Sequence, residues 1–172
     1  MDATVFPHQV EVLGMTHEPY EERLEPADAL MLQFESADTA FHTLKIAILD
    51  SSERGHPVQL EKLRTWVPRY LDITPRLTQR VVRRSYWRWF WVDDTDFAID
   101  HHLEERTVSG PGGLDELCGE LATRQLDRSR PLWRLTLVHG LPDGRQAVVA
   151  QVHHAIMDGS AAMNAFAAVT TA

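Results

Sequence analysis

The chain has 172 residues, of which 44% are hydrophobic and 24% charged, and its formal net charge is −8. This length and composition are sufficient for one globular domain with a buried core. This net negative charge argues against electrostatic binding of the chain as a whole to nucleic acid or anionic lipid, although local basic patches are compatible with it. The single Cys118 excludes an internal disulfide framework and a multi-cysteine zinc site, and we expect a reducing, cytosolic environment.

The first 23 residues show no helical or strand period. Pro7, Gly14 and Pro19 interrupt a polar, mixed sequence, which predicts an irregular leader over residues 1–23. The start of the chain lacks the basic segment and apolar core of an export signal. No stretch approaches the roughly 18 consecutive apolar residues of a membrane span.

Three elements are expected between residues 26 and 70. Pro26 at a first helical position, followed by apolar residues up to Phe34, favours a short helix. Apolar and polar residues alternate over 43–49, which indicates a strand. Residues 57–70 place their apolar side chains at helical spacing and predict a second helix.

An aromatic run over residues 86–92 permits two interpretations. Trp87, Trp89 and Trp91 alternate with Tyr86, Arg88 and Phe90, so both faces of the expected strand are largely aromatic. One interpretation is a strand covered on both sides. The other is an apolar wall or a membrane-facing edge.

Two further segments are interpreted as structural. His101 and His102 form a histidine pair that no Asp-Gly follows, and we assign them to structure and not to catalysis. Leu114, Leu117, Cys118 and Leu121 then recur at helical spacing, which predicts a helix with Cys118 on its buried stripe.

The last predicted unit is an antiparallel hairpin. Residues 133–138 and 146–152 are apolar runs that flank the turn sequence at Pro142-Asp143-Gly144. Trp133 and His153 are equally far from Asp143, so they should lie side by side within one or two residues of register. We expect the sheet to bury the three valines of the second strand, Val148, Val149 and Val152.

A histidine motif, His153-His154-Ala155-Ile156-Met157-Asp158-Gly159, ends this hairpin. Adjacent strand residues point to opposite faces, so we expect one imidazole to be structural and the other to open to a cleft. A free imidazole has a pKa near 6.5 and acts as a general base at neutral pH. Asp158 is either a second catalytic carboxylate or the partner of an arginine, and Gly159 permits a positive φ before a small-residue helix.

These residues carry a resemblance. His153 to Gly159 is similar to the HHxxxDG signature of the CoA-dependent acyltransferase superfamily, which includes chloramphenicol acetyltransferase and condensation domains. The run from Leu126 to Trp133, with Gly140-Leu141 and Asp143-Gly144-Arg145, resembles the bacterial wax ester synthase/diacylglycerol acyltransferase family more narrowly. Residues 24–28 and 100–103 also fit, so the likeness covers residues 24–172.

The resemblance implies a fold and an organisation. It implies an α/β chloramphenicol acetyltransferase-like two-layer sandwich with a mixed sheet, forming one half of a two-domain architecture. Residues 24–172 are then the N-terminal acyltransferase domain, and the C-terminal domain is a second chain or a missing segment.

The resemblance also implies roles for single residues. His154 is the general base and His153 a supporting motif residue, while Asp158 pairs with an arginine and is architectural. Arg134 and Arg80 are candidates for that arginine by position only. Gly159 permits close packing and passage of the CoA arm, and a structural motif near the site comprises Pro131, Leu132 and Trp133.

The implied function is transfer of a fatty acyl group from acyl-CoA, as a substrate and not a cofactor, to diacylglycerol or a long-chain alcohol. No acyl-enzyme is required, because a thiol leaves more readily than an alcohol. The alternatives are a condensation-domain-like transferase, a noncatalytic binding half, a purely structural histidine, and an isolated metal site, for which no third ligand is evident. We expect no metal, and a cytoplasmic location or a peripheral one at a membrane or lipid droplet.

Overall fold

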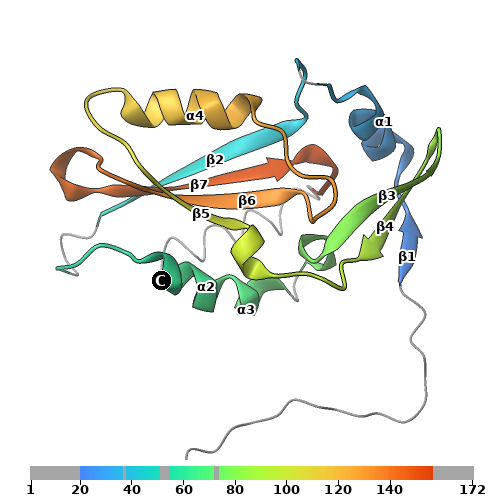
Figure 1. Cartoon of the computed structure of the whole chain (residues 1–172), viewed down its shortest axis with the longest axis horizontal. Coiled ribbons are helices and arrows are strands. Elements are labelled where there is room, and N and C mark those ends of the chain that lie inside the picture. Colours follow the sequence, from blue (N-terminus) through green and yellow to red (C-terminus); the bar gives the residue numbers. More distant parts are fainter. Residues whose placement is uncertain (1–19, 37, 51–54, 72–73, 157–172) are drawn as a thin grey trace, which may run out of the picture.

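The computed structural model describes residues 20–36, 38–50, 55–71 and 74–156. Its centre is a four-stranded sheet in the order β2-β7-β6-β5 (Figure 1). The strands are β2 (His42–Leu49), β5 (Leu103–Thr107), β6 (Trp133–His139) and β7 (Gln146–His153). β5 runs parallel to β6, and the other two pairings are antiparallel. The predicted α/β architecture with a mixed sheet is confirmed.

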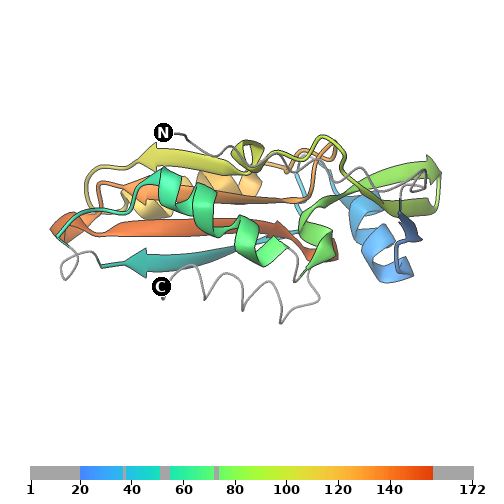
Figure 2. The same cartoon turned by 90° about the horizontal axis from the view of Figure 1, so that it is seen from below.

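Helices cover both faces of this sheet. On one face Leu117 and Leu121 of α4 (Gly113–Thr123) form an apolar cluster with Val149 of β7. On the other, Leu63 of α2 (Leu60–Trp66) belongs to the larger core together with Val148. α3 (Pro68–Leu71) follows α2, and Figure 2 shows both in front of the strands with α4 behind. Successive side chains of β7 point to opposite faces of the sheet, so β7 contributes to the core on each side. All of its residues are therefore buried.

The predicted hairpin is formed by β6 and β7. Trp133 pairs with Val152, one residue from His153, so the predicted register is confirmed within its margin. The turn contains a short 3-10 helix, η3 (Pro142–Gly144), in which Asp143 has a φ of 61° and Gly144 a φ of 69°. Asp and Gly tolerate this left-handed region better than other residues, which explains the turn signal. The three valines expected in the core, Val148, Val149 and Val152, are 1%, 0% and 7% exposed.

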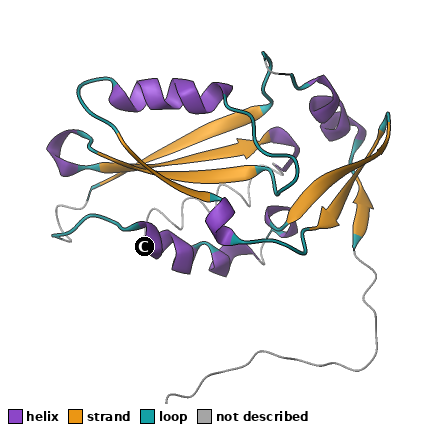
Figure 3. Ribbon diagram, viewed as in Figure 1, coloured by secondary structure: helices purple, strands orange, loops and turns teal. Residues whose placement is uncertain are grey.

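A second, three-stranded antiparallel sheet lies at one end of the molecule in the order β1-β4-β3 (Figure 3). Its strands are β1 (Glu21–Arg23), β3 (Gln79–Ser85) and β4 (Arg88–Asp93). Residues 21–23, which we expected to be irregular, form a strand that pairs with β4, and the rest of the predicted leader up to residue 19 lies outside the described part of the chain.

The aromatic run divides between the two interpretations. Trp89 and Trp91 of β4 are 6% and 2% exposed, as a covered strand requires. Tyr86 and Trp87, however, form the turn between β3 and β4, where they are 60% and 57% exposed. The run is thus not a single strand, because the chain reverses within it.

The remaining helical elements agree with the expected positions. α1 (Pro26–Phe34) begins at its proline and buries Leu32. Cys118 of α4 is partly buried against the apolar cluster that α4 forms with β7, and burial raises the pKa of its thiol. The other 3-10 helices are η1 (Pro75–Leu77), η2 (Ile99–His101) and η4 (His154–Ile156).

Leu137→Ala tests the central core. Leu137 of β6 is 0% exposed, and its truncation leaves a cavity, so we expect the free energy of unfolding to fall by about 2–5 kcal/mol. Leu30→Ala is the matched control: Leu30 is 44% exposed on α1, and its loss should cost less than about 1 kcal/mol. Urea unfolding followed by circular dichroism compares the two, and equal losses would contradict the assignment of the core.

Candidate active site

The two motif histidines have opposite environments. His153 is the last residue of β7 and is 1% exposed, whereas His154 begins η4 and is exposed. The backbone of both is held: the His153 N–H donates to Leu132 O at 3.0 Å, and the His154 N–H donates to Phe41 O at 2.8 Å. The strand end is therefore fixed from two sides, while the His154 side chain stays accessible.

The hydrogen bonds of His153 define its protonation state. Its Nδ1 accepts the backbone N–H of Ala155 at 3.0 Å, so a neutral ring carries its proton on Nε2. That Nε2 lies 3.6 Å from Glu35 Oε1 and makes no hydrogen bond within the described part of the chain. Burial lowers the pKa of His153 to about 4, although the nearby Glu35 carboxylate opposes the shift. His153 is therefore neutral at neutral pH.

A buried carboxylate that the sequence did not single out organises this strand end. The Glu35 side chain, just after α1, is 3% exposed and pairs with Arg128, Nη2 to Oε2, at 2.7 Å. Its other oxygen accepts the Phe41 N–H at 3.3 Å and faces His153. Arg128 also donates to Leu32 O at 2.8 Å. Arg128 lies in the 126–133 run that carried the resemblance, and this is the only sequence signal that pointed here.

The Pro131-Leu132-Trp133 segment supports the site from the neighbouring strand. Trp133 donates its indole N–H to Leu77 O at 2.8 Å and stacks on His102 with ring centroids 4.4 Å apart. His102 is 2% exposed and its Nδ1 lies 2.9 Å from Trp133 O, while burial lowers its pKa. The structural interpretation of His102 is thus in agreement with its surroundings, and His101 is exposed.

Asp158 and Gly159 lie outside the described residues, so the partner of Asp158 stays a prediction. The two candidate arginines have other carboxylates near them: Arg134 Nε lies 3.9 Å from Glu104, and Arg80 Nε lies 4.0 Å from Asp94. Arg134 is the more buried of the two side chains, at 17% exposed against 40%.

Within the described ranges, no three His, Cys, Asp or Glu side chains come together as metal ligands would. The same part of the chain contains no helix that is long and apolar enough to cross a membrane.

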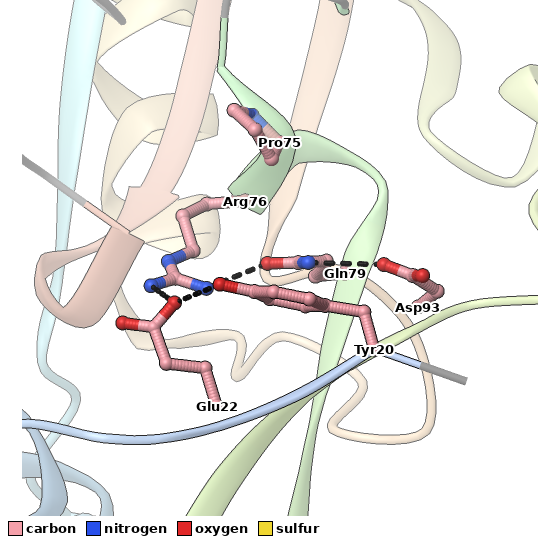
Figure 4. A pocket seen from close by; sticks show the side chains of 6 residues that line it. All are labelled: Tyr20, Glu22, Pro75, Arg76, Gln79 and Asp93. Carbon is pink, nitrogen blue, oxygen red and sulfur yellow. Dashed lines mark hydrogen bonds and ion pairs between the residues drawn. The ribbon is translucent and has the colours of Figure 1, made fainter. Parts of the chain in front are cut away.

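A pocket of about 520 Å³ is lined by residues of β1, of η1 and of the paired ends of β3 and β4, and by none of the motif histidines (Figure 4). Its polar groups satisfy one another: Arg76 binds Glu22 at 2.8 Å and Gln79 at 2.7 Å, and Gln79 donates to Asp93 at 3.0 Å. Hydrogen bonds from Tyr20 and Arg76 lower the pKa of Glu22. This network links β1 to η1, β3 and β4 through side-chain hydrogen bonds and an ion pair.

Comparison with solved structures identifies the fold. The condensation domain of the Monacolin K polyketide synthase MokA matches with a TM-score of 0.63 and 12% identity, over 87% of this chain and 33% of that one. A wax ester synthase/diacylglycerol acyltransferase from Marinobacter aquaeolei VT8 matches with a TM-score of 0.68 and 27% identity, over 83% of this chain and 35% of that one. The fold is thus the one shared by condensation domains and this acyltransferase.

Sequence comparison identifies the family. The profile of the wax ester synthase/diacylglycerol acyltransferase catalytic domain matches residues 24–172. A Mycobacterium tuberculosis relative that carries the name of a diacylglycerol O-acyltransferase is 34% identical over 151 residues. Another from that species, tgs3, is 36% identical over 146 residues, 82% of this chain and 53% of its own. The chain belongs to the wax ester synthase/diacylglycerol acyltransferase family.

The chain is shorter than these relatives. The 34% identical protein aligns with 85% of this chain but with only 32% of its own length. The chain therefore spans about a third of the length of this relative.

The low pKa of His153 predicts a pH-dependent stability. Between pH 4 and 6.5 the unfolded chain binds a proton at this residue that the folded chain does not bind, so stability falls as the pH drops through this window. The loss amounts to about 3 kcal/mol for this group. Urea unfolding across this range should show a smaller loss for His153→Asn, whereas His101→Asn, which replaces an exposed histidine, should keep the wild-type slope. Identical slopes for all three proteins would exclude a buried neutral His153.

Glu35→Gln tests the buried ion pair. It leaves Arg128 without its charged partner, and we expect the free energy of unfolding to fall by about 1–3 kcal/mol. Glu120→Gln is the matched control, because Glu120 also pairs with an arginine, Arg106, at 2.7 Å, but its side chain is 48% exposed. The exposed pair should contribute much less, because solvent screens it and holding two long side chains together costs entropy. An equal effect of the two substitutions in urea unfolding would refute the organising role of Glu35.

Proposed function

We propose that this chain carries the histidine-bearing half of an O-acyltransferase that moves a fatty acyl group from acyl-CoA to diacylglycerol or a long-chain alcohol. The observation that carries the proposal is the accessible His154 at a strand end whose backbone is fixed by Leu132 and Phe41. The family membership and the names of the relatives, which are acyltransferases, support the same reaction.

In the proposed reaction His154 acts as the base. It accepts the hydroxyl proton of the alcohol while the oxygen forms a bond to the thioester carbonyl carbon. The carbon–sulfur bond then breaks, and the imidazolium returns its proton to the CoA sulfur. One residue performs both proton transfers, the products are an ester and free CoA, and no acyl-enzyme forms. Acyl-CoA is a substrate here, and the step uses no metal or other cofactor.

His153 has a different task in this proposal. Its Nδ1 is occupied by the Ala155 N–H and its ring is buried, so it cannot take the alcohol proton. It fixes the chain direction from which His154 extends. Asp158 is assigned to an arginine that holds the motif loop, and Gly159 to close passage of the CoA arm.

The domain organisation is part of the proposal. Residues 24–172 form the N-terminal acyltransferase domain, and a C-terminal acyltransferase domain, as a second chain or a further segment, completes the site. The protein acts in the cytoplasm, at the edge of a membrane or lipid droplet where its lipid substrates gather. A condensation-type transfer is less well supported, because the likeness to condensation domains at 12% identity concerns the fold.

His154→Ala tests the proposed base. Transfer from a long-chain acyl-CoA to diacylglycerol or hexadecanol is measured for the chain alone and with any co-purifying polypeptide. We expect the rate to fall by at least about a hundredfold, because a general base contributes that much or more. His101→Ala, which removes an exposed histidine of the other pair, should leave the rate unchanged.

Unchanged circular dichroism must accompany the loss of activity. Retained turnover by His154→Ala would exclude the residue as base. Absence of turnover by the wild type in both preparations would favour a noncatalytic binding role for this half.

A further inference from the structure

The tip of the β3–β4 hairpin combines exposed aromatic and basic side chains. Its six residues, Arg83-Arg84-Ser85-Tyr86-Trp87-Arg88, are all exposed. Tyr86 and Trp87 pack edge to face with ring centroids 4.8 Å apart, and the two residues are 60% and 57% exposed. We propose that this tip, residues 83–88, docks the protein on the surface of a membrane or lipid particle that carries anionic headgroups. The inference deepens the proposed function, since it names where an enzyme of lipid substrates meets its lipid.

The charge of the tip is opposite to that of the chain. The whole sequence has a formal charge of −8, but the tip contains three arginines and no acidic residue. Within the described part of the chain Arg84 pairs with Glu21 at 3.1 Å, whereas Arg83 and Arg88 have no ion pair. A negative surface repels most of this molecule and attracts this end, so it orients the protein tip first.

The aromatic residues suit a lipid interface better than a core or a nucleic acid groove. Tyr and Trp prefer the headgroup region, where their rings contact acyl chains and their polar atoms meet water. The guanidinium of Arg83 lies 5.0 Å from the Tyr86 ring, and that of Arg88 lies 5.5 Å from the Phe90 ring. Arg83 therefore lies along the face of the exposed Tyr86 ring and can bind a phosphate while that ring enters the interface, whereas Arg88 lies beside the half-buried Phe90 ring of β4.

The tip stands at the end of a paired hairpin. β3 and β4 are paired up to Ser85 and Arg88, with a register shift between Arg83 and Ser85, and their buried residues Val81, Trp89 and Trp91 belong to the main core. This pairing fixes the base of the tip, so part of its conformational entropy is already lost before it meets a surface.

The position of the tip also fits the proposed chemistry. The hairpin lies at the same end of the molecule as α1, which exposes Leu30 and Phe34 (Figures 1 and 2). η4, which begins with His154, packs against α1. α1, which directly follows β1 of the three-stranded sheet, therefore links the part of the molecule that carries the tip to the motif with His154.

The test measures cosedimentation of the full chain with vesicles of phosphatidylcholine alone and of phosphatidylcholine mixed with phosphatidylglycerol. The wild type should bind the mixed vesicles more tightly, and added salt should weaken this binding. Arg88→Ser should lower the affinity about fivefold, which is the expected contribution of one arginine near an anionic surface. Trp87→Ser should lower it about tenfold through lost apolar burial.

Two matched controls remove comparable exposed groups elsewhere. Arg69→Ser deletes one exposed positive charge on α3, and Ile46→Ser deletes an apolar side chain that is 47% exposed on β2. Both should bind vesicles like the wild type. Thermal unfolding of all four variants verifies that they fold, which is expected because every substituted side chain is exposed.

Equal binding of the wild type to both kinds of vesicle would overturn the proposal. So would unchanged binding after Trp87→Ser and Arg88→Ser. A third contradicting result would be tip substitutions that mainly change self-association on gel filtration. Vesicle binding requires no turnover, so His154→Ala should bind like the wild type. An inactive protein that docks would refute the acyl transfer alone, and an active protein that does not dock would refute the docking alone.

Discussion

The ion pair between Glu35 and Arg128 is the constraint on which the candidate site depends. It joins the end of α1 to the segment before β6, and the other oxygen of Glu35 lies 3.6 Å from His153 Nε2 at the end of β7. Glu35 also binds the Phe41 N–H, and Phe41 O receives the N–H of His154. A charge that is 3% exposed is tolerated only with such partners, so the pair fixes the strand end in one arrangement.

This arrangement explains why the adjacent residues His153 and His154 have different roles. The ring of His153 is held neutral by burial, its Nδ1 accepts the Ala155 N–H, and it is only 1% exposed, so a substrate does not reach it. The ring of the next residue, His154, is exposed. A doublet of identical residues thus gives one support and one reactive group, because the strand ends between them. In the proposed docking, the aromatic and basic hairpin tip brings the protein, and with it this reactive group, to a lipid surface.

Much of the fold could be predicted from the sequence, because β7 and its partner strand are apolar runs joined by a Pro-Asp-Gly turn. The same turn set the register that places Trp133 beside the histidines. The Tyr86-Trp87 turn could not be predicted, since it contains neither glycine nor proline and both faces of the run are aromatic. Glu35 was missed because a carboxylate after a helix usually faces water, and its partner lies 93 residues away. Strand β1 was missed because three residues are too few to show an alternation of apolar and polar side chains.

The division between the two histidines is tested most directly by proton–nitrogen correlation NMR of the imidazole rings over a pH series, with His153→Asn to assign the signal. The account predicts that His153 stays neutral, with its proton on Nε2 and Nδ1 unprotonated, down to about pH 5. A cationic His153 above that pH, or a proton on its Nδ1, would contradict it.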